Sequence, residues 1–332
     1  MASLPLLPDS AARLVGIARL ASHSETVWQG REVEYFALPV KSLLNRCTSA
    51  RMPFRWTINP YRGCEFACKY CYARYTHEFM EMRDGIEFEQ KIYAKQHAAD
   101  LLRQELRRVK PGEEIALGTA TDPYQPIERK LEITRSILQE FARHSGLKIG
   151  IVTKSAMVTR DTDLLAEVAK CNSLYVNITI TTTDAALARI LEPRAPRPDL
   201  RLEALKKLRR AGIPAGVICA PVLPGITDAP HQLEDVVRMA VAADACHVHC
   251  NPLFLKPCSA AVFLPFLKEN FPKLVAGYEK RFASQAFLPA AYRNRISKLF
   301  AQLRAKYRVT RDSGWHWESR NESEGQLELF RR

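Results

Sequence analysis

From residue 115 onward the chain alternates short β-rich runs with amphipathic helical stretches, and one further β-rich run precedes them. Alternation of this kind is typical of a parallel sheet covered by helices, and right-handed crossovers leave a barrel or an open, doubly wound sheet. Asp161 and Asp163 are candidate caps for the third helix. The predicted strands are residues 54–58, 114–118, 148–153, 174–182, 215–223 and 246–250, and the predicted helices are residues 94–108, 131–143, 161–170, 198–211 and 231–243.

The run at residues 175–181 favours the barrel. A parallel strand packed by helices on both sides should be apolar on both faces. Here one face is polar, which predicts that the strand lines a cavity. The apolar positions are Val176, Ile178 and Ile180, and the polar ones are Tyr175, Asn177, Thr179 and Thr181. Six strands rather than eight fit the length, so we expect an α/β fold: a single incomplete (β/α)6 TIM-like barrel with an N-terminal extension and C-terminal helices.

We divide the chain into four parts on this basis. Residues 1–50 form the N-terminal extension and residues 51–255 the partial barrel core. Residues 256–312 form a C-terminal helical extension with a basic helix, and the polar residues 313–332 a flexible tail. No apolar run approaches the ~18–20 residues of a membrane span. The first residues lack a basic segment and are interrupted by Pro5 and Pro8, so we expect a cytoplasmic protein without a membrane partner.

Charge and cysteine content narrow the function further. The net charge of +13 favours polyanionic partners. Nine cysteines are an odd number, and no export signal accompanies them. A disulfide scaffold is therefore disfavoured, and metal or redox use of the thiols is favoured.

Three of the cysteines lie close together after the first predicted strand. Cys64, Cys68 and Cys71 have the spacing C-x3-C-x2-C. Three thiolates on one short loop can hold three corners of a cubane iron–sulfur cluster, because soft sulfur suits iron. The fourth iron then lacks a protein ligand, which implies chemistry at the cluster. The alternative is a structural zinc site that adds His77 as the fourth ligand.

The spacing, with the aromatic Tyr70 before the third cysteine, resembles the signature of radical S-adenosylmethionine (SAM) enzymes. The similarity spans residues 38–250 and resembles the branch grouped with spore photoproduct lyase, also called DNA repair photolyase-like. The segments that carry it are MPFRWTINPYRGCEFACKYCYARYTHEF, GTATDPYQPIE, TKSAMVTRD, ITITTTD and LEPRAPRP.

The resemblance implies a [4Fe–4S] cluster held by Cys64, Cys68 and Cys71, with SAM bound at the open iron. One electron then cleaves SAM to methionine and a 5′-deoxyadenosyl radical, which abstracts a hydrogen atom from the substrate. A low-potential electron donor is required. The protein itself supplies placement and exclusion of side reactions.

The resemblance also implies SAM contacts at the ends of several strands. Three of these residues also have a purely structural interpretation. Lys154 could be an exposed lysine at a strand end, and Thr179 could be a β-branched residue that favours a strand. Arg194 could be a solvated surface arginine. The family's Gly-Gly-Glu motif is replaced here by Thr-Ala-Thr-Asp. The candidate SAM-binding residues are Tyr70, which is expected against the adenine, and Thr119, Thr121, Asp122, Lys154, Thr179 and Arg194.

The lyase restores its product radical with a further thiol. Cys250 and Cys258 are the weak candidates for such a catalytic role here, because they lie near the end of the last predicted strand. The alternative is that both are small buried residues, as free cysteines usually are.

Two segments near the C-terminus suggest partners. Residues 293–311 carry seven Lys or Arg and no acid, and their apolar side chains recur at helical spacing. This helix is expected to contact nucleic-acid phosphates, or else to pack on the barrel with its charges solvated. Residues 326–330 read QLELF, which is similar to the peptide that docks on the bacterial DNA sliding clamp, unless this tail packs on its own domain.

The leading hypothesis is therefore a radical SAM enzyme that acts on nucleic acid, in repair-type lyase chemistry. A second hypothesis keeps the cofactors and makes the substrate a protein or a small metabolite. A third is a zinc-stabilised DNA-binding protein without catalysis.

Overall fold

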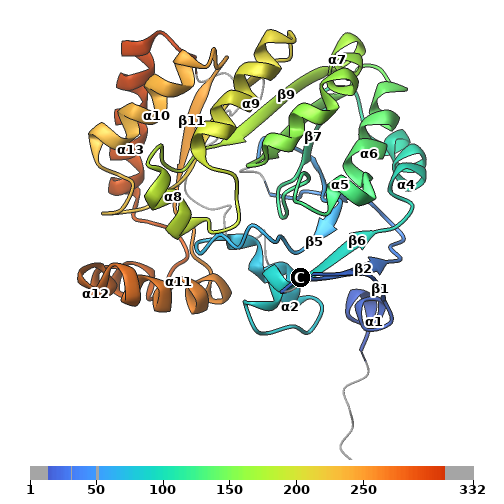
Figure 1. Ribbon diagram of the computed structural model, residues 1–332, viewed down its shortest axis with the longest axis horizontal. Coiled ribbons are helices and arrows are strands. Elements are labelled where there is room, and N and C mark those ends of the chain that lie inside the picture. The colour runs from blue at the N-terminus through green and yellow to red at the C-terminus, as the bar shows by residue number, and fades with distance from the viewer. Residues whose placement is uncertain (1–13, 31, 50–51, 311–332) are drawn as a thin grey trace, which may run out of the picture.

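A computed structural model of the protein describes residues 14–30, 32–49 and 52–310 (Figure 1). Its main sheet has seven strands in the order β11-β10-β9-β8-β7-β4-β3. Neighbours from β4 to β11 pair in parallel, and only β3 is antiparallel, at one edge. The strands are β3 Leu44–Arg46, β4 Trp56–Ile58, β7 Glu114–Leu117, β8 Lys148–Thr153, β9 Ser173–Thr179, β10 Ala215–Val222 and β11 Val248–Pro252.

The six parallel strands are those predicted from the sequence, with shifts of a few residues at their ends. They follow one another in space in the same order as in the chain. Helices lie along the outside of this sheet in Figure 1, so the mixed α/β class with a parallel sheet is confirmed. These helices are α4 Ala98–Glu105, α6 Ile133–Ala142, α7 Thr162–Cys171, α9 Pro198–Arg210 and α10 Pro230–Ala242, with the short α5 Glu128–Leu131 and α8 Ala185–Leu191 between them.

The N-terminal extension contains regular structure that the sequence analysis missed. Helix α1 (Gly16–Ser22) is followed by β1 (Glu25–Gln29) and β2 (Glu34–Leu38). Strands β1 and β2 belong to a second sheet of order β1-β2-β6-β5, which also contains β5 (Tyr61–Arg62) and β6 (Lys91–Lys95). The predicted helix start at residue 94 is wrong, because β6 pairs with strands on both sides. The helix begins only at Ala98, after His97 in the left-handed conformation.

The C-terminal extension contains α11 (Pro257–Asn270), α12 (Val275–Phe282) and α13 (Ala290–Tyr307). Helix α13 covers most of the basic segment, and its helical conformation is confirmed. Ile296, Phe300 and Leu303 are buried where α13 packs on α10 and β11. Residue 311, the tail 313–332 and its peptide 326–330 lie outside the described residues. In the part of the chain that the structure describes, none of the helices combines the length and apolarity that a bilayer crossing needs.

Asn177 and Thr179 on the polar face of β9 are buried, and so are Val176 and Ile178 on its apolar face. Asn177 is fully buried, and its Oδ1 lies 2.8 Å from Nε2 of His247, which is also fully buried. The opposing position on β10 is Gly216. A Cβ atom there would lie 2.4 Å from Cε1 of His247, so the close approach of strand and imidazole requires glycine.

We therefore expect Gly216→Ala to destabilise the fold by about 1–3 kcal/mol, because the extra methyl group must displace His247 from Asn177. Urea unfolding of the purified protein measures the change. The matched control is Gly277→Ala in α12, where the nearest atom to an added Cβ is 3.4 Å away. Equal stability of both variants and the wild type would contradict this account.

Candidate active site

Residues 63–71, which we call the thiol loop, lie between β5 and η1 (Tyr72–Arg74) and carry three cysteines. Gly63 opens the loop with φ +85°, and a Cβ there would lie 2.8 Å from the carbonyl oxygens of Phe88 and Lys91. The Cys64 amide then donates to the Phe88 carbonyl at 3.0 Å. Glycine thus lets the chain turn tightly against residues 88–91, which fixes the start of the loop.

Cys64, Cys68 and Cys71 are all free thiols. Burial raises the pKa of each thiol, that of Cys68 to about 12, and the thiol of Cys71 raises the pKa of Cys64 and of Cys68 further. The positive charge of Lys154 works in the opposite direction at Cys68 and Cys71. Three soft donors that share one apolar environment, with a cation beside them, fit an iron–sulfur cluster.

The geometry does not favour the zinc alternative. His77 is buried, and its Nε2 lies 3.0 Å from the Lys91 carbonyl oxygen. Burial lowers its pKa to about 4. Among the described residues, no three His, Cys, Asp or Glu side chains converge on a point where a single metal ion would bind. A cubane cluster does not require the thiolates to converge on one point, because each thiolate binds a separate iron.

Tyr70 is held from behind by a buried ion pair. Its hydroxyl donates to the Glu192 carboxylate and lies 3.0 Å from the Thr181 hydroxyl. Arg201 donates to the other Glu192 oxygen, and both side chains are 1% exposed. Arg201 also donates to the Thr179 carbonyl oxygen at 3.1 Å. This network ties the thiol loop to the end of β9 and to α9.

The segment after α8 contacts the thiol loop through its backbone as well. The Lys69 amide donates to the Leu191 carbonyl at 3.0 Å, and the Arg194 amide to the Phe66 carbonyl at 3.4 Å. On the other side, the Ser259 hydroxyl of α11 donates to the Cys71 carbonyl at 2.8 Å. Two parts of the chain that are distant in sequence therefore fix the loop.

Lys154 follows β8 and is half-buried beside the loop. Its Nζ lies 5.8 Å from the centre of the Tyr70 ring. Burial disfavours its charge, but its electrostatic interactions with the Cys68 sulfur and the Glu192 carboxylate outweigh burial and raise its pKa. Thr179, at the end of β9, is buried close by. The structure thus places Lys154 beside Tyr70 of the thiol loop, and Thr179 is linked to Tyr70 through Arg201 and Glu192.

Asp122 and Thr121, after β7, are occupied by the protein's own groups. Asp122 Oδ1 accepts from the Thr153 hydroxyl at 2.6 Å and from the Tyr124 amide, and Oδ2 accepts from the Lys154 amide at 2.7 Å. The Thr121 hydroxyl donates to the Gly63 carbonyl at 2.6 Å. These two side chains join β7, β8 and the thiol loop.

Thr119 lies at the same edge of the sheet and is partly exposed. Its carbonyl oxygen accepts from the Tyr72 hydroxyl, and its own hydroxyl lies 3.4 Å from Nδ2 of Asn59. Thr119 therefore also connects the end of β7 to the residue that follows the third cysteine.

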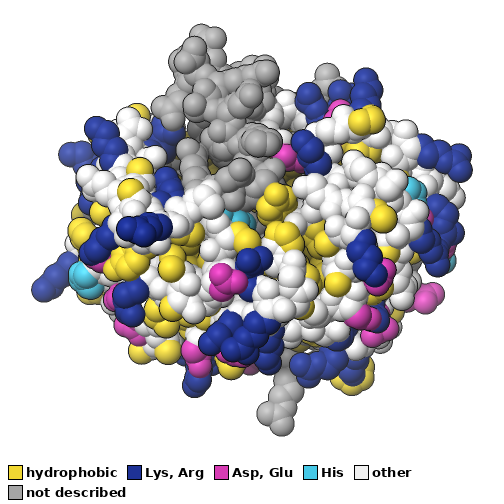
Figure 2. All heavy atoms as spheres, turned by 90° about the horizontal axis from the view of Figure 1, so that it is seen from above, with side chains coloured by type: hydrophobic (Ala, Val, Ile, Leu, Met, Phe, Trp, Pro, Cys, Tyr) yellow, Lys and Arg dark blue, Asp and Glu magenta, His cyan; other side chains and the backbone are white. Residues whose placement is uncertain are grey.

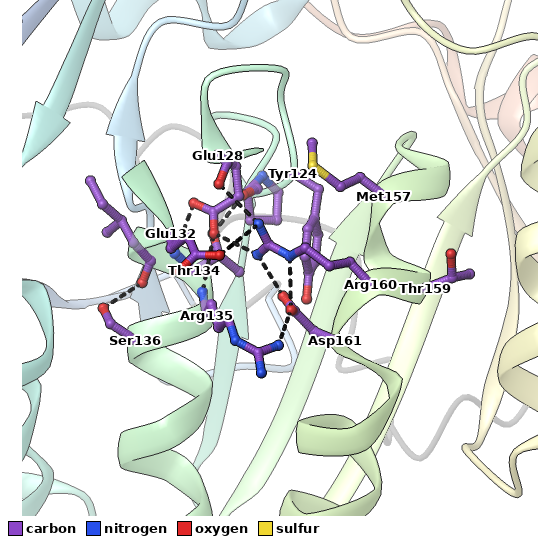
Figure 3. Close-up of polar contacts among 12 residues, drawn as sticks. Tyr124, Glu128, Glu132, Thr134, Arg135, Ser136, Met157, Thr159, Arg160 and Asp161 are labelled. Atoms are coloured by element: carbon purple, nitrogen blue, oxygen red, sulfur yellow. Dashed lines mark hydrogen bonds and ion pairs between the residues drawn. The ribbon is translucent and has the colours of Figure 1, made fainter. Parts of the chain in front are cut away.

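A network of buried polar groups lies beyond the ends of β7 and β8 (Figure 3). Arg160 of η3 (Ala156–Asp161) lies between Glu128 and Asp161, and its Nη2 is 3.0 Å from Glu128 Oε1 and 2.8 Å from Asp161 Oδ2. Arg135 reaches Asp161 Oδ1 at 2.6 Å. Both carboxylates are fully buried. The prediction that Asp161 caps α7 is wrong, because these two arginines occupy its oxygens and it makes no cap hydrogen bond.

Arg194 and the two candidate thiols lie in different surroundings. Arg194 pairs with Glu32 at 2.5 Å on the surface. Cys250 of β11 lies opposite Cys219 of β10. Cys258 is in the first turn of α11, one residue before the Ser259 that contacts the thiol loop.

Glu192 and Arg201 are the site residues that the sequence analysis missed. Glu192 lies in the segment LEPRAPRP, where only Arg194 was singled out. A carboxylate between a leucine and a proline, at the end of a short helix, was the available signal. Its partner Arg201 lies nine residues further on, in α9, and local spacing does not identify such a pair.

Comparison with known proteins places this site in a family. The model of the radical SAM superfamily matches residues 58–240, more than half of the chain. An uncharacterised protein of Mycobacterium tuberculosis is 36% identical over 309 residues, which are 92% of this chain and 91% of the relative. An uncharacterised protein of Methanocaldococcus jannaschii is 32% identical over 174 residues, 52% of this chain and 62% of the relative.

Solved structures with similar folds are more distant in sequence. A mutant of spore photoproduct lyase superposes with a TM-score of 0.64 at 13% identity, over 82% of this chain and 79% of the lyase. Streptococcus suis SuiB bound to its precursor peptide SuiA gives a TM-score of 0.51 at 14% identity, over 76% of this chain and 46% of SuiB. At such identities the likeness extends to the fold alone.

Proposed function

The chain belongs to the radical SAM superfamily, and we propose that it acts on nucleic acid, as a lyase in repair-type chemistry. It is a radical SAM enzyme, and its cofactors are a [4Fe–4S] cluster and SAM. Bound together, they supply the 5′-deoxyadenosyl radical that abstracts a hydrogen atom from the substrate. The observation that carries the proposal is the enclosed set of three free thiols beside Tyr70 and Lys154.

In this proposal Cys64, Cys68 and Cys71 hold the cluster. The six parallel strands curve into a partial (β/α)6 barrel, within residues 51–255, whose polar interior lies under the thiol loop. Asn177 and His247 form part of that interior. Buried side chains such as these keep water out of the interior, which protects a reactive radical from side reactions.

The binding of SAM is assigned to the residues at the strand ends. Lys154 offers a charged donor to the carboxylate of SAM, Thr179 a hydroxyl to its ribose, and Tyr70 a ring face to its adenine. Thr121 and Asp122 act as positioning residues, because their side chains hold the thiol loop and the Lys154 backbone. Arg194 and Thr119 remain candidates at the rim, and Cys258 remains the better candidate for a hydrogen-atom donor than Cys250.

The nucleic-acid part of the proposal is supported by charge. The chain has 49 Lys and Arg against 36 Asp and Glu. Figure 2 shows Lys and Arg side chains around the edge of one face, with fewer acids between them. Helix α13 contributes less than its sequence indicates, because Arg295 pairs with Asp228 at 2.9 Å and Lys306 with Glu234 at 2.5 Å. The remaining cations suit a phosphate backbone.

The test measures 5′-deoxyadenosine by chromatography after anaerobic reconstitution, reduction with dithionite and addition of SAM. We expect slow cleavage of SAM alone and faster cleavage with ultraviolet-irradiated DNA, because substrate binding completes the site. Unirradiated DNA and a basic peptide are the controls. Cleavage that no nucleic acid alters would overturn the substrate assignment, and the absence of all cleavage would overturn the enzyme assignment. A low-potential protein donor is expected to replace dithionite.

A further inference from the structure

Five aromatic rings follow one another outward from the third cysteine of the thiol loop. The centre of the Tyr72 ring lies 6.5 Å from that of Tyr75, which lies 5.8 Å from that of Phe79. On the other side, Tyr72 lies 6.2 Å from Phe254, and Phe254 lies 4.3 Å from Phe287. We call these five residues the aromatic row. Its members come from three separate stretches of the chain, so the fold and not the local sequence assembles them.

The aromatic row is not part of the hydrophobic core. None of its five rings belongs to the four apolar clusters that the described residues form, and none lies at their margins. Tyr72 is 40% exposed and Phe79 51% exposed. Single exposed aromatic residues need no explanation, but a contiguous row beside a functional site marks an interaction surface.

The row is joined rigidly to the site. Tyr72 directly follows Cys71, and its hydroxyl donates to the Thr119 carbonyl at the end of β7. Phe254 and Phe287 are connected by an isolated antiparallel β-bridge, which fixes two of the rings on the backbone. A ligand that lies on the row therefore reaches the thiol loop at Tyr72.

Positive charge accompanies the rings. Lys256 Nζ lies 4.0 Å above the centre of the Tyr75 ring. Burial raises the pKa of Tyr75, and the nearby charge of Arg62 on β5 opposes this rise. Arg62 also donates to the Thr76 carbonyl at 3.2 Å. Glu78 is the acidic residue near Lys256. Aromatic faces flanked by Lys and Arg are the surface on which unpaired bases stack while their phosphates meet the cations.

We propose that the aromatic row binds an unpaired stretch of nucleic acid, whose bases stack on Phe79, Tyr75 and Tyr72 and lead one nucleotide toward the thiol loop. This inference rests on the proposed function and names its substrate more closely, as nucleotides outside a duplex. Stacking on neighbouring base pairs covers the faces of bases in a duplex, so the row discriminates in favour of single strands or of a base turned out of its helix.

The test uses the full chain, reconstituted anaerobically, and a fluorescein-labelled 12-nucleotide oligothymidylate, single-stranded or paired with its complement. Fluorescence anisotropy is expected to give at least about fivefold tighter binding of the single strand. Phe79→Ala should lower that affinity at least about fivefold, whereas Phe79→Trp should retain it, because a ring face is preserved. Phe79 is largely exposed, so its replacement leaves the fold intact.

Trp28 and Lys130 provide the matched control. Trp28 is 46% exposed on β1, and Lys130 Nζ lies 2.9 Å from the centre of its ring, so the pair repeats the chemistry of Tyr75 and Lys256 outside the row. Trp28→Ala should leave oligonucleotide affinity unchanged. Lys256→Gln should weaken binding and reduce its dependence on salt, whereas Lys130→Gln should change neither.

The outcomes separate the two proposals. If wild-type protein cleaves SAM but binds the duplex as tightly as the single strand, or if Phe79→Ala binds like wild type, the aromatic row has another role and the enzyme assignment stands. Binding of a labelled peptide that depends on Phe79, with no binding of oligonucleotide, also overturns the inference. If the wild-type protein does not cleave SAM, the proposed function fails, and the 5′-deoxyadenosine assay detects this independently of oligonucleotide binding.

Discussion

Cys68→Ala protein, purified and reconstituted without oxygen, will contain far less iron than the wild type and will form no 5′-deoxyadenosine from SAM. Cys68 is the buried cysteine of the thiol loop, so no water or side chain from the surface can take its place. Loss of one of three thiolates leaves two irons of a cubane without protein ligands. Iron analysis and chromatography of the SAM reaction measure the two effects.

Cys171→Ala is the matched control, because Cys171 is an exposed free thiol at the end of α7. It should retain wild-type iron content and SAM cleavage. A Cys68→Ala protein that keeps both properties would show that the thiol loop does not hold the cluster.

Removal of one partner of the Glu192–Arg201 pair is expected to lower both the stability of the protein and its affinity for SAM. Both side chains are 1% exposed, and Glu192 also accepts the Tyr70 hydroxyl. Arg201→Met leaves a buried carboxylate without its counter-charge, which costs about 3–5 kcal/mol. It also frees Tyr70, so affinity for SAM should fall as well. Urea unfolding and equilibrium dialysis with labelled SAM measure the two changes.

The control for this variant is Arg197→Met. Arg197 and Asp199 form an ion pair at 2.6 Å, but their side chains are 57% and 52% exposed. Loss of such a surface pair should cost at most about 1 kcal/mol. In the double variant Glu192→Gln/Arg201→Met most of the lost stability should return, since the buried carboxylate is removed together with its arginine partner. If Arg201→Met and Arg197→Met are equally stable, the buried pair does not support the loop.

The parallel strands could be predicted because each carries its own local signal. A run such as residues 148–153 is β-rich and bounded by turns, and strands in this sheet follow one another in chain order, so adjacency required no long-range information. The second sheet was missed for the opposite reason. β5 has two residues, and β6 pairs in parallel with β2, more than fifty residues earlier. A two-residue strand has no periodicity to detect.

In the active site, too, local features could be predicted from the sequence and long-range contacts could not. The cysteine spacing is local, so the thiol loop could be identified from the sequence. The partners of Tyr70 could not, because Glu192 and Arg201 meet it only through the packing of α8 and α9 against the loop. Asp122 illustrates a further limit. Its place after β7 was predicted, but not that Thr153, Tyr124 and Lys154 would occupy its carboxylate.

The central claim is that Cys64, Cys68 and Cys71 hold a [4Fe–4S] cluster with one iron left open for SAM. Electron paramagnetic resonance of the reduced, reconstituted protein tests it directly, with and without SAM. We expect a brown protein whose reduced-cluster spectrum changes shape when SAM is added. A spectrum that SAM leaves unchanged, or a colourless protein with one equivalent of zinc, would contradict it.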